Sequence, residues 1–292
     1  MRLLAQVCAG VRVRVDVEPD WLTPASQMPW PVVTPFRIRP NLEKLDPVAP
    51  ALLLRDELAD VYGRERELVV AAHAERAMIG TANEAALNAI LSLAPSPAAR
   101  ARVGVRAAAE SLQEDFVILK QNNDTLRTEY LSVCFPSRWD PREKLGLDFA
   151  AIHAPVADNQ TLIAAGQSIM TMAFMKQPML RHVWLIVPSA SLNQHPEQNE
   201  AWWTEALRDM SPLLTNLFFR VERQTTWPLP HLQRAVFFIR VMMSPLVDVI
   251  KAAPGRAAEL AASLRSMTPE VIAYRGMTDA MPRLLAELEH FE

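Results

Sequence analysis

Residues 116–135 read FVILKQNNDTLRTEYLSVCF, and this stretch decides the fold class of the 292-residue chain. It begins with a short apolar run, Phe116 to Lys120, and a polar cluster of turn-forming residues follows at 121–124. The remainder, Leu126 to Phe135, is rich in Tyr, Val, Leu and Thr, which favour strands, and Pro136 ends it. The stretch therefore predicts a β-hairpin.

Downstream of the hairpin, short apolar runs alternate with segments of helical spacing. We predict helices over 141–153 and 162–175, and strands over 182–187, 217–225 and 235–242. Together with the hairpin these strands form a five-stranded antiparallel sheet crossed by helices. This α+β order is typical of a PAS-like domain.

N- and C-terminal segments that are mainly helical are expected to frame this core, and the N-terminal one begins with a strand and an arm. Residues 11–18, VRVRVDVE, alternate as a strand does, and the proline-rich segment 19–50 is expected to wrap the surface as an ordered arm. We expect the aromatic side chains of Trp21, Trp30 and Phe36 to anchor this arm against the rest of the protein.

Helical spacing dominates the rest of the first 113 residues and the tail from Pro245. Helices are predicted over 51–79, 81–93 and 98–113, and Thr81 with Glu84 resembles a capping box. The patterns divide the chain into an N-terminal strand, arm and helices (1–113), a PAS-like core (114–244) and C-terminal helices (245–292). We expect the three parts to form one compact unit.

The composition excludes several classes of protein. Half of the residues are hydrophobic and 22% are charged, as in folded globular chains. The 30 Lys and Arg against 33 Asp and Glu give a net charge of -3, which argues against a nucleic-acid partner. The longest uncharged stretch, 159–175, is too short and too polar for a membrane span, and no secretion signal is recognisable. We therefore expect a cytoplasmic protein without a membrane partner.

Common catalytic and cofactor motifs are absent from the sequence. The 8 glycines form no phosphate-binding loop, and there is no GxSxG elbow and no HExxH pair. The two cysteines, Cys8 and Cys134, lack the spacing of a metal site and are expected to be buried free thiols. The Met-rich segment 170–179 is best explained as core filling.

Three segments of the second half contain motifs of a known family. The first is LSVCFPSRWDPREKLGLDFAAIHAPV at 131–156, with CFPS, a Trp, K-[IL]-G and IHxPV. Arg181 and Trp184 match an R-x-N-W strand, in which Val183 replaces the Asn. FFRVERQTTWPLP at 218–230, then FFIR ending at Arg240, match the third segment. In this order the motifs resemble those of the haem-dependent oxidative N-demethylase family.

The resemblance implies a PAS-type domain that holds haem b, an iron cofactor. Relatives act as monooxygenases that use dioxygen to demethylate a small secondary amine oxidatively, and they release formaldehyde. The electrons come from a separate flavin and iron–sulfur reductase. Two alternatives remain: a haem-binding PAS-type sensor, and a haem-free interaction protein on the same scaffold.

His153 of the IHxPV motif is the preferred metal ligand. It ends a short apolar helix before Pro155 and could present a neutral imidazole to the haem iron. His195 and His182 are the next candidates. Without the family context, a core histidine with ordinary hydrogen bonds would be the more frequent explanation for His153.

Arginines and one carboxylate on the late strands complete the predicted site. Haem propionates require planar cationic donors, and the cofactor-binding candidates are Arg181, Arg220, Arg223 and Arg240. A structural ion-pair network is an equally good explanation for any one of them. An ammonium substrate requires a carboxylate or an aromatic face, and the catalytic candidates are Glu222 and Trp184.

Overall fold

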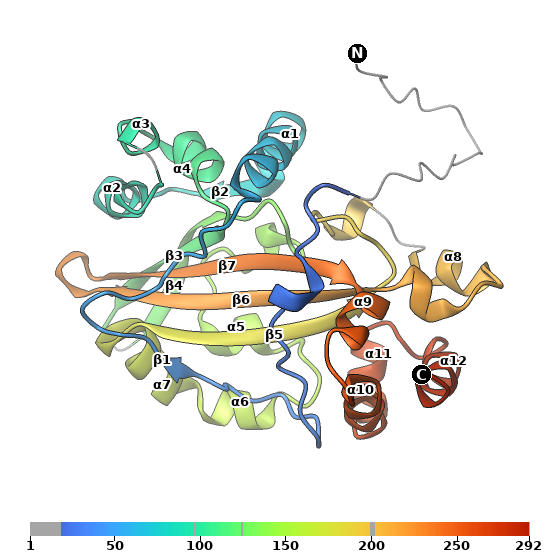
Figure 1. Cartoon of the computed structure of the whole chain (residues 1–292). Helices are drawn as coiled ribbons and strands as arrows, with labels where there is room; N and C mark the ends of the chain where they lie inside the picture. The colour runs from blue at the N-terminus through green and yellow to red at the C-terminus, as the bar shows by residue number, and fades with distance from the viewer. Residues whose placement is uncertain (1–18, 96, 124, 199–201, 292) are drawn as a thin grey trace, which may run out of the picture.

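An antiparallel sheet organises the chain (Figure 1). The structure is a computed structural model, and it describes residues 19–95, 97–123, 125–198 and 202–291. Within these ranges the sheet has seven strands in the order β1-β5-β6-β7-β3-β4-β2. The predicted α+β class with an antiparallel sheet is therefore confirmed, whereas the strand predicted over 11–18 lies outside the described residues.

The predicted hairpin and the three late strands are present. The hairpin consists of β3 (Asp115–Asn122) and β4 (Thr125–Ser132). The late strands are β5 (Met179–Val187), β6 (Phe218–Leu229) and β7 (Arg234–Pro245). Because β3 pairs with β7, the hairpin lies beside the last strand, and these five strands form the continuous middle of the sheet.

Two short strands extend the sheet beyond the five that were predicted. β1 (Glu43–Lys44) pairs with the start of β5, and β2 (Met78–Gly80) pairs with the end of β4. The helix predicted over 51–79 therefore ends earlier, because its last residues leave it to pair with β4. Gly80 follows with a φ of +91°, a value that glycine adopts without strain.

The upstream helices are shorter than their predicted ranges. They are α1 (Ala59–Ala77), α2 (Glu84–Ser92), α3 (Pro97–Arg100) and α4 (Val105–Ser111). The capping box predicted at Thr81 is wrong. The side chain of Asn83 caps α2 instead, because its backbone is extended and its side-chain oxygen accepts from the N–H of Ala86 at 3.0 Å.

A series of short helices joins β4 to β5. It contains the 3-10 turn η2 (Pro141–Lys144), α5 (Phe149–His153), α6 (Gln160–Ala164), α7 (Gly166–Ile169) and the π-helical turn η3 (Met170–Lys176). Gly146, with a φ of +75°, separates η2 from α5 and interrupts the helix predicted over 141–153.

The remaining helices gather near the C-terminus. They are α8 (Trp202–Arg208), α9 (Leu246–Lys251), α10 (Arg256–Arg265), α11 (Pro269–Tyr274) and α12 (Met281–Glu289). Short 3-10 turns, η1 (Ala25–Gln27), η4 (Pro196–Gln198), η5 (Leu213–Asn216) and η6 (Pro230–Leu232), complete the described elements.

The segment 19–58, here named the arm, crosses the sheet in Figure 1, where it is drawn in blue. Its aromatic residues anchor it as predicted. The Trp21 indole donates to the Ala190 carbonyl at 2.8 Å, the ring of Trp30 lies 5.2 Å from that of Phe219, and Phe36 meets Trp184 edge-on. The arm is thus a packed layer of the fold rather than a loose extension.

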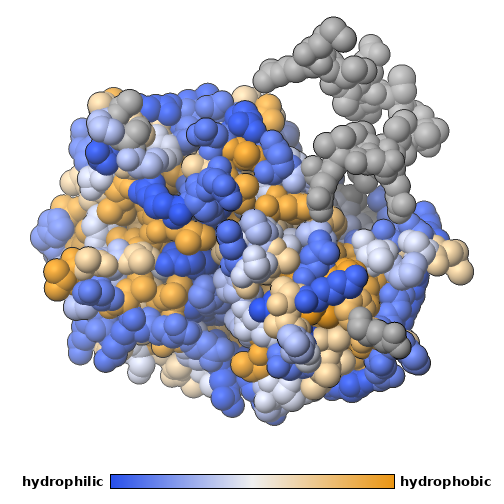
Figure 2. Space-filling view, viewed as in Figure 1, coloured by the Kyte–Doolittle hydropathy of each residue, from blue (hydrophilic) through white to orange (hydrophobic). Residues whose placement is uncertain are grey.

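No helix in the described part of the chain is long and apolar enough to cross a membrane. Figure 2 shows hydrophilic and hydrophobic side chains interspersed over this side of the molecule.

Candidate functional site

The alternation of side chains along β5, β6 and β7 divides the predicted site residues between two faces of the sheet. Paired residues of antiparallel strands share a face, so the register assigns each one. The face that α5 covers, here named the α5 face, bears Arg181, Arg220 and Glu222. The face that the arm covers, here named the arm face, bears Trp184, Arg223 and Arg240.

His153 ends α5, on the side of the sheet where Arg181 and Glu222 lie. Asp148 caps the start of this helix by accepting from the N–H of Ala151 at 3.0 Å. The Nδ1 atom of His153 lies 2.7 Å from the Phe149 carbonyl, which can only accept, so Nδ1 bears the proton. Nε2 keeps a free lone pair, and no described residue bonds to it. This arrangement is typical of a histidine that ligates a metal ion.

Burial favours the neutral imidazole of His153. It lowers the pKa of His153, and the positive charges of Arg181 and Lys144 act in the same direction. The hydrogen bond with Phe149 opposes this shift only in part. The ring also packs on the Phe149 ring, with 4.2 Å between centroids. His153 is therefore held in the form that a metal ion requires.

Arg181 has an unused donor on the same face. Its Nε atom is buried and has no hydrogen-bond partner among the described residues. Burial lowers the pKa of Arg181, and the nearby Glu222 opposes the shift without forming an ion pair. A buried guanidinium donor without a partner is costly, so this position favours an external anion such as a carboxylate.

The α5 face also bears a buried apolar cluster that includes Val117, Leu131 and Met170. Side chains that pack against this cluster and remain partly exposed are Trp139, Phe149, Phe174, Met175 and Phe237. Partly exposed aromatic side chains and an unpartnered Arg181 donor are the residue types that the apolar body and the carboxylates of a haem require.

Glu222 is the carboxylate at the centre of the α5 face. It is 8% exposed, and both of its oxygens accept hydrogen bonds from side chains. The Ser137 hydroxyl donates to Oε1, and the Gln224 amide donates to Oε2 at 2.7 Å. These two donors fix the orientation of the carboxylate.

Arg220 lies two positions before Glu222 on β6, on the same face, and is fully buried. Each of its three nitrogens has a protein partner: Nε donates to Ser137 Oγ at 2.8 Å, Nη2 to the Phe135 carbonyl at 2.8 Å, and Nη1 to the Leu192 carbonyl at 3.1 Å. Burial lowers the pKa of Arg220 to about 10, and Glu222 opposes this shift. Arg220 thus ties two loops to β6, a role that differs from the predicted contact with a cofactor.

The arm-face residues bind the arm instead of approaching His153. Arg223 donates to the carbonyls of Leu52 at 3.1 Å and Ala51 at 2.5 Å. Arg240 donates to Asp56 at 2.8 Å. The structure therefore places these two predicted cofactor ligands on the opposite side of the sheet from His153, with partners in the arm.

Trp184 also packs against residues on the arm face, away from His153. It is buried between Phe36 and Phe219, and the guanidinium of Arg275 lies 4.9 Å from its ring centroid. The two candidates for holding an ammonium group, Trp184 and Glu222, lie on different faces, because Trp184 pairs with Val221 and Glu222 is the next residue along β6. His182, a second-choice ligand, also points to the arm face.

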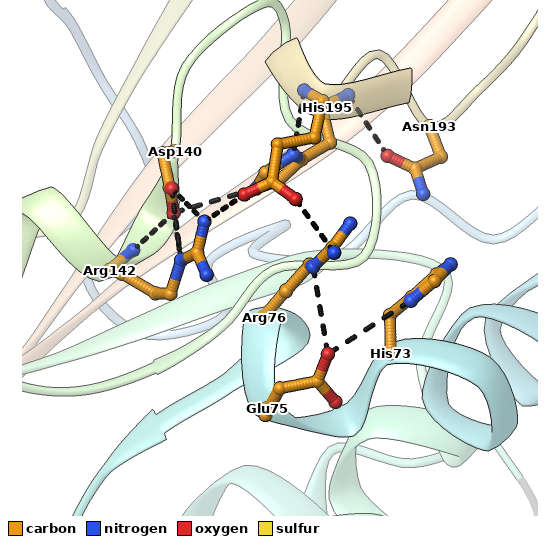
Figure 3. A network of polar contacts seen from close by, with 8 residues as sticks. His73, Glu75, Arg76, Asp140, Arg142, Asn193 and His195 are labelled. Carbon is orange, nitrogen blue, oxygen red and sulfur yellow. Dashed lines mark hydrogen bonds and ion pairs between the residues drawn. The ribbon is translucent and has the colours of Figure 1, made fainter.

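A separate cluster of Asp140, His195 and Glu197 has the spacing of a metal site, since its ligand atoms all lie within 4.8 Å of one another (Figure 3). The arginines beside the two carboxylates argue against metal binding by this cluster. Arg142 contacts both carboxylates and Arg76 lies 2.6 Å from Glu197, and the hydrogen bonds from Arg142 lower the pKa of Asp140 to about 2.

The tautomer of His195 also argues against a metal site. Its Nδ1 accepts from the N–H of Glu197 at 3.2 Å, so the proton of the neutral ring is on Nε2, 3.5 Å from Asp140. The buried Nε2 then offers no lone pair to a metal ion. We interpret the cluster as an ion-pair network that joins the end of α1 to the loops around η2 and η4, and His195 as part of that network.

Sequence reasoning missed two residues that contact Glu222. They are Ser137, in the CFPS motif, and Gln224, two positions after Glu222 on β6. Both residues belong to the family motifs, Ser137 to CFPS and Gln224 to the segment at 218–230. Their polar side chains within these motifs are the feature from which a role in the site could have been predicted. Only the fold brings Ser137, 85 positions earlier in the chain, to the carboxylate.

Comparison with known protein families gave one finding. A family model described as haem-dependent oxidative N-demethylase, alpha subunit-like, matches residues 78–285. The match extends from β2 into α12, and it includes His153, Arg181 and Glu222. A comparison with curated proteins gave no match.

Proposed function

The chain belongs to the family of haem-dependent oxidative N-demethylase alpha subunit-like proteins, and from this premise we propose that it binds haem b on the α5 face and demethylates a small secondary amine. The observation that supports this proposal most is the state of His153. Its Nδ1 is bound to a backbone carbonyl, its Nε2 is free of partners among the described residues, and burial lowers its pKa.

The residues of the α5 face fit a haem. In our proposal His153 ligates the iron, Arg181 binds a propionate through its unused Nε donor, and Phe149, Phe174 and Phe237 contact the macrocycle. When bound, the haem would supply the iron at which dioxygen is activated. Arg220, Arg223 and Arg240 stabilise the surrounding loops and the arm.

We assign the amine to Glu222. An ammonium group that leaves water requires a negative partner, and Glu222 is an almost buried carboxylate on the same face as Arg181. The overall reaction consumes dioxygen, two electrons and two protons, and it yields the demethylated amine, formaldehyde and water. Trp184 takes no part in this proposal because it lies on the arm face.

The electrons are proposed to come from a separate reductase. The sequence contains no flavin or nucleotide fingerprint, and its two cysteines are too few for an iron–sulfur cluster with four thiolate ligands. A flavin and iron–sulfur reductase would satisfy the electron balance.

We also propose that the middle of the sheet is a PAS-like core. Its support is the order β5-β6-β7-β3-β4, in which the first hairpin pairs with the last strand and short helices follow β4. A haem between such helices and the α5 face would lie within this core.

A visible spectrum of the haem-supplemented protein tests the proposal. We expect a Soret band in the wild type, and His153→Ala should reduce haem affinity on the order of tenfold or more, since an iron ligand is lost. His182→Ala is the matched control, because His182 is also partly buried but points to the arm face; it should keep its haem. Formaldehyde release from dimethylamine with an added reductase tests the activity.

Two results would contradict the proposal. A wild type without a Soret band after haem supplementation would exclude haem binding, both for an enzyme and for a sensor. A His153→Ala protein with unchanged ligation would exclude His153 as the iron ligand.

A further inference from the structure

We propose that Ser137 is a positioning residue that holds the Glu222 carboxylate in place for the ammonium group of the substrate. The inference rests on the proposed function of Glu222 and adds a residue that no motif match assigns to the site. It follows from the hydrogen bonds of a single hydroxyl.

The direction of the Ser137 hydrogen bonds is determined by its neighbours. A serine hydroxyl has one hydrogen and two lone pairs. Arg220 Nε can only donate, and it donates to Ser137 Oγ at 2.8 Å. The single hydroxyl hydrogen is then directed to Glu222 Oε1. Ser137 thus links Arg220 to the carboxylate by hydrogen bonds, since no ion pair joins these two described residues directly.

The backbone holds Ser137 independently of its hydroxyl. Ser137 forms a parallel bridge with Gln194. On either side of it, the N–H of Arg138 donates to the Gln194 carbonyl at 2.9 Å, and the N–H of Gln194 donates to the Pro136 carbonyl at 3.1 Å. Removing the hydroxyl should therefore leave the loop in place and change only the contacts of Glu222 and Arg220.

The remaining lone pairs of Glu222 define the ligand chemistry. Ser137 and Gln224 each use one lone pair, on different oxygens, and leave others for the N–H groups of a ligand. A secondary ammonium ion offers two such N–H donors, whereas a quaternary ammonium ion offers none. A fixed carboxylate should accordingly prefer dimethylammonium to tetramethylammonium, and the preference should weaken when Ser137 no longer fixes it.

Titration of the haem-loaded proteins with dimethylammonium chloride tests this inference, with the visible spectrum as the readout. Ser137→Ala should raise the dissociation constant about tenfold, as expected for the loss of one hydrogen bond to a charged group. Ser137→Thr, which keeps the hydroxyl, should restore most of the affinity. Ser189→Ala is the matched control, because it removes a nearby hydroxyl that accepts from the N–H of Ser191.

A double-variant cycle separates positioning from a general structural effect. Glu222→Gln should abolish the response to dimethylammonium or reduce it strongly, and adding Ser137→Ala to Glu222→Gln should have no further effect. Imidazole, a neutral iron ligand, should bind Ser137→Ala and the wild type equally.

The outcomes distinguish this inference from the function on which it rests. An unaffected Ser137→Ala, in a wild type that responds to the amine, would overturn the role of Ser137 alone. The same holds if Ser137→Ala weakens imidazole as much as dimethylammonium. A haem-loaded wild type without any response to the amine would overturn the amine assignment and the inference together.

Discussion

At the scale of single residues, Cys134 is a thiol that the fold protects from reaction. It is fully buried in the CFPS motif, beside the ion pair of Arg66 and Asp115. Burial raises the pKa of Cys134 to about 12, and the positive charge of Arg66 opposes this shift only in part. Since the thiolate is the reactive form, native Cys134 should be inert near neutral pH. Its predicted burial as a free thiol is confirmed, whereas Cys8 lies outside the described residues.

The prediction concerns the rate of labelling by a disulfide reagent at pH 8 in a Cys8→Ser background. We expect no detectable labelling of native Cys134 over minutes and one thiol per chain in urea. Ser92→Cys, at an exposed position of α2, is the positive control and should label at once. Rapid labelling of the native protein without Ser92→Cys would show that Cys134 is accessible.

The raised pKa also has a defined effect on stability. The folded pKa of Cys134 lies above the unfolded value of about 8.5. The stabilisation from keeping the thiol protonated is therefore complete below about pH 8.5. It is lost as the pH rises toward 12.

The site residues show how far single positions can be interpreted from sequence. Strand alternation correctly placed Arg220 and Glu222 on one face and Arg223 on the other. It could not show that Arg223 and Arg240 bind arm residues more than 170 positions away, because local patterns contain no information on such contacts. His153 remains a prediction, although its geometry is what a ligand requires.

At the scale of elements, Asp115 connects three of them. It starts β3, is 1% exposed, and receives the guanidinium of Arg66 from α1 at 2.7 Å. Its carboxylate also accepts from the backbone N–H groups of Cys134 at 2.7 Å and Phe135 at 3.1 Å, which follow β4. One buried carboxylate thus fixes α1 and the motif loop to the sheet.

We predict that Asp115→Ala lowers the free energy of unfolding by about 3 to 5 kcal/mol, because it leaves a buried guanidinium and two N–H groups without their partner. Urea denaturation measures the effect. Asp20→Ala is the control: Asp20 pairs with Arg64 of α1 at 3.0 Å, both side chains are more than half exposed, and its loss should cost about 1 kcal/mol or less. Equal losses for the two variants would contradict the special role of Asp115.

Element prediction succeeded where the pattern was local and long. The turn cluster at 121–124 and the apolar runs around it were sufficient to predict β3 and β4. β1 and β2 were missed because Glu43–Lys44 and Met78–Gly80 are too short to alternate, and each exists only through pairing with a strand formed elsewhere. The helix predicted over 162–175 divides into α6, α7 and η3, which share the apolar spacing but differ in hydrogen bonding.

At the scale of the whole molecule, one apolar cluster joins the three segments proposed from the sequence, 1–113, 114–244 and 245–292. It combines arm residues such as Phe36, sheet residues such as Val221, and Leu284 of α12. Hydrogen bonds cross the same boundary, because Ser266 accepts from the N–H of Phe36 at 2.7 Å and Ser263 donates to the Val33 carbonyl at 2.8 Å. We propose that the segments unfold as one cooperative unit.

Leu284→Ala tests this cooperativity. Leu284 is fully buried in the shared cluster, so the variant should lose about 2 to 5 kcal/mol of unfolding free energy. Hydrogen exchange followed by mass spectrometry should show that peptides from the arm, from β6 and from α12 lose protection together. Leu68→Ala, at a leucine that is 63% exposed on α1, should change stability by about 0.5 kcal/mol or less. If Leu284→Ala accelerates exchange only in residues 245–292, the C-terminal helices are a separate unit, because a shared core transmits the loss of one buried side chain to every element that packs on it.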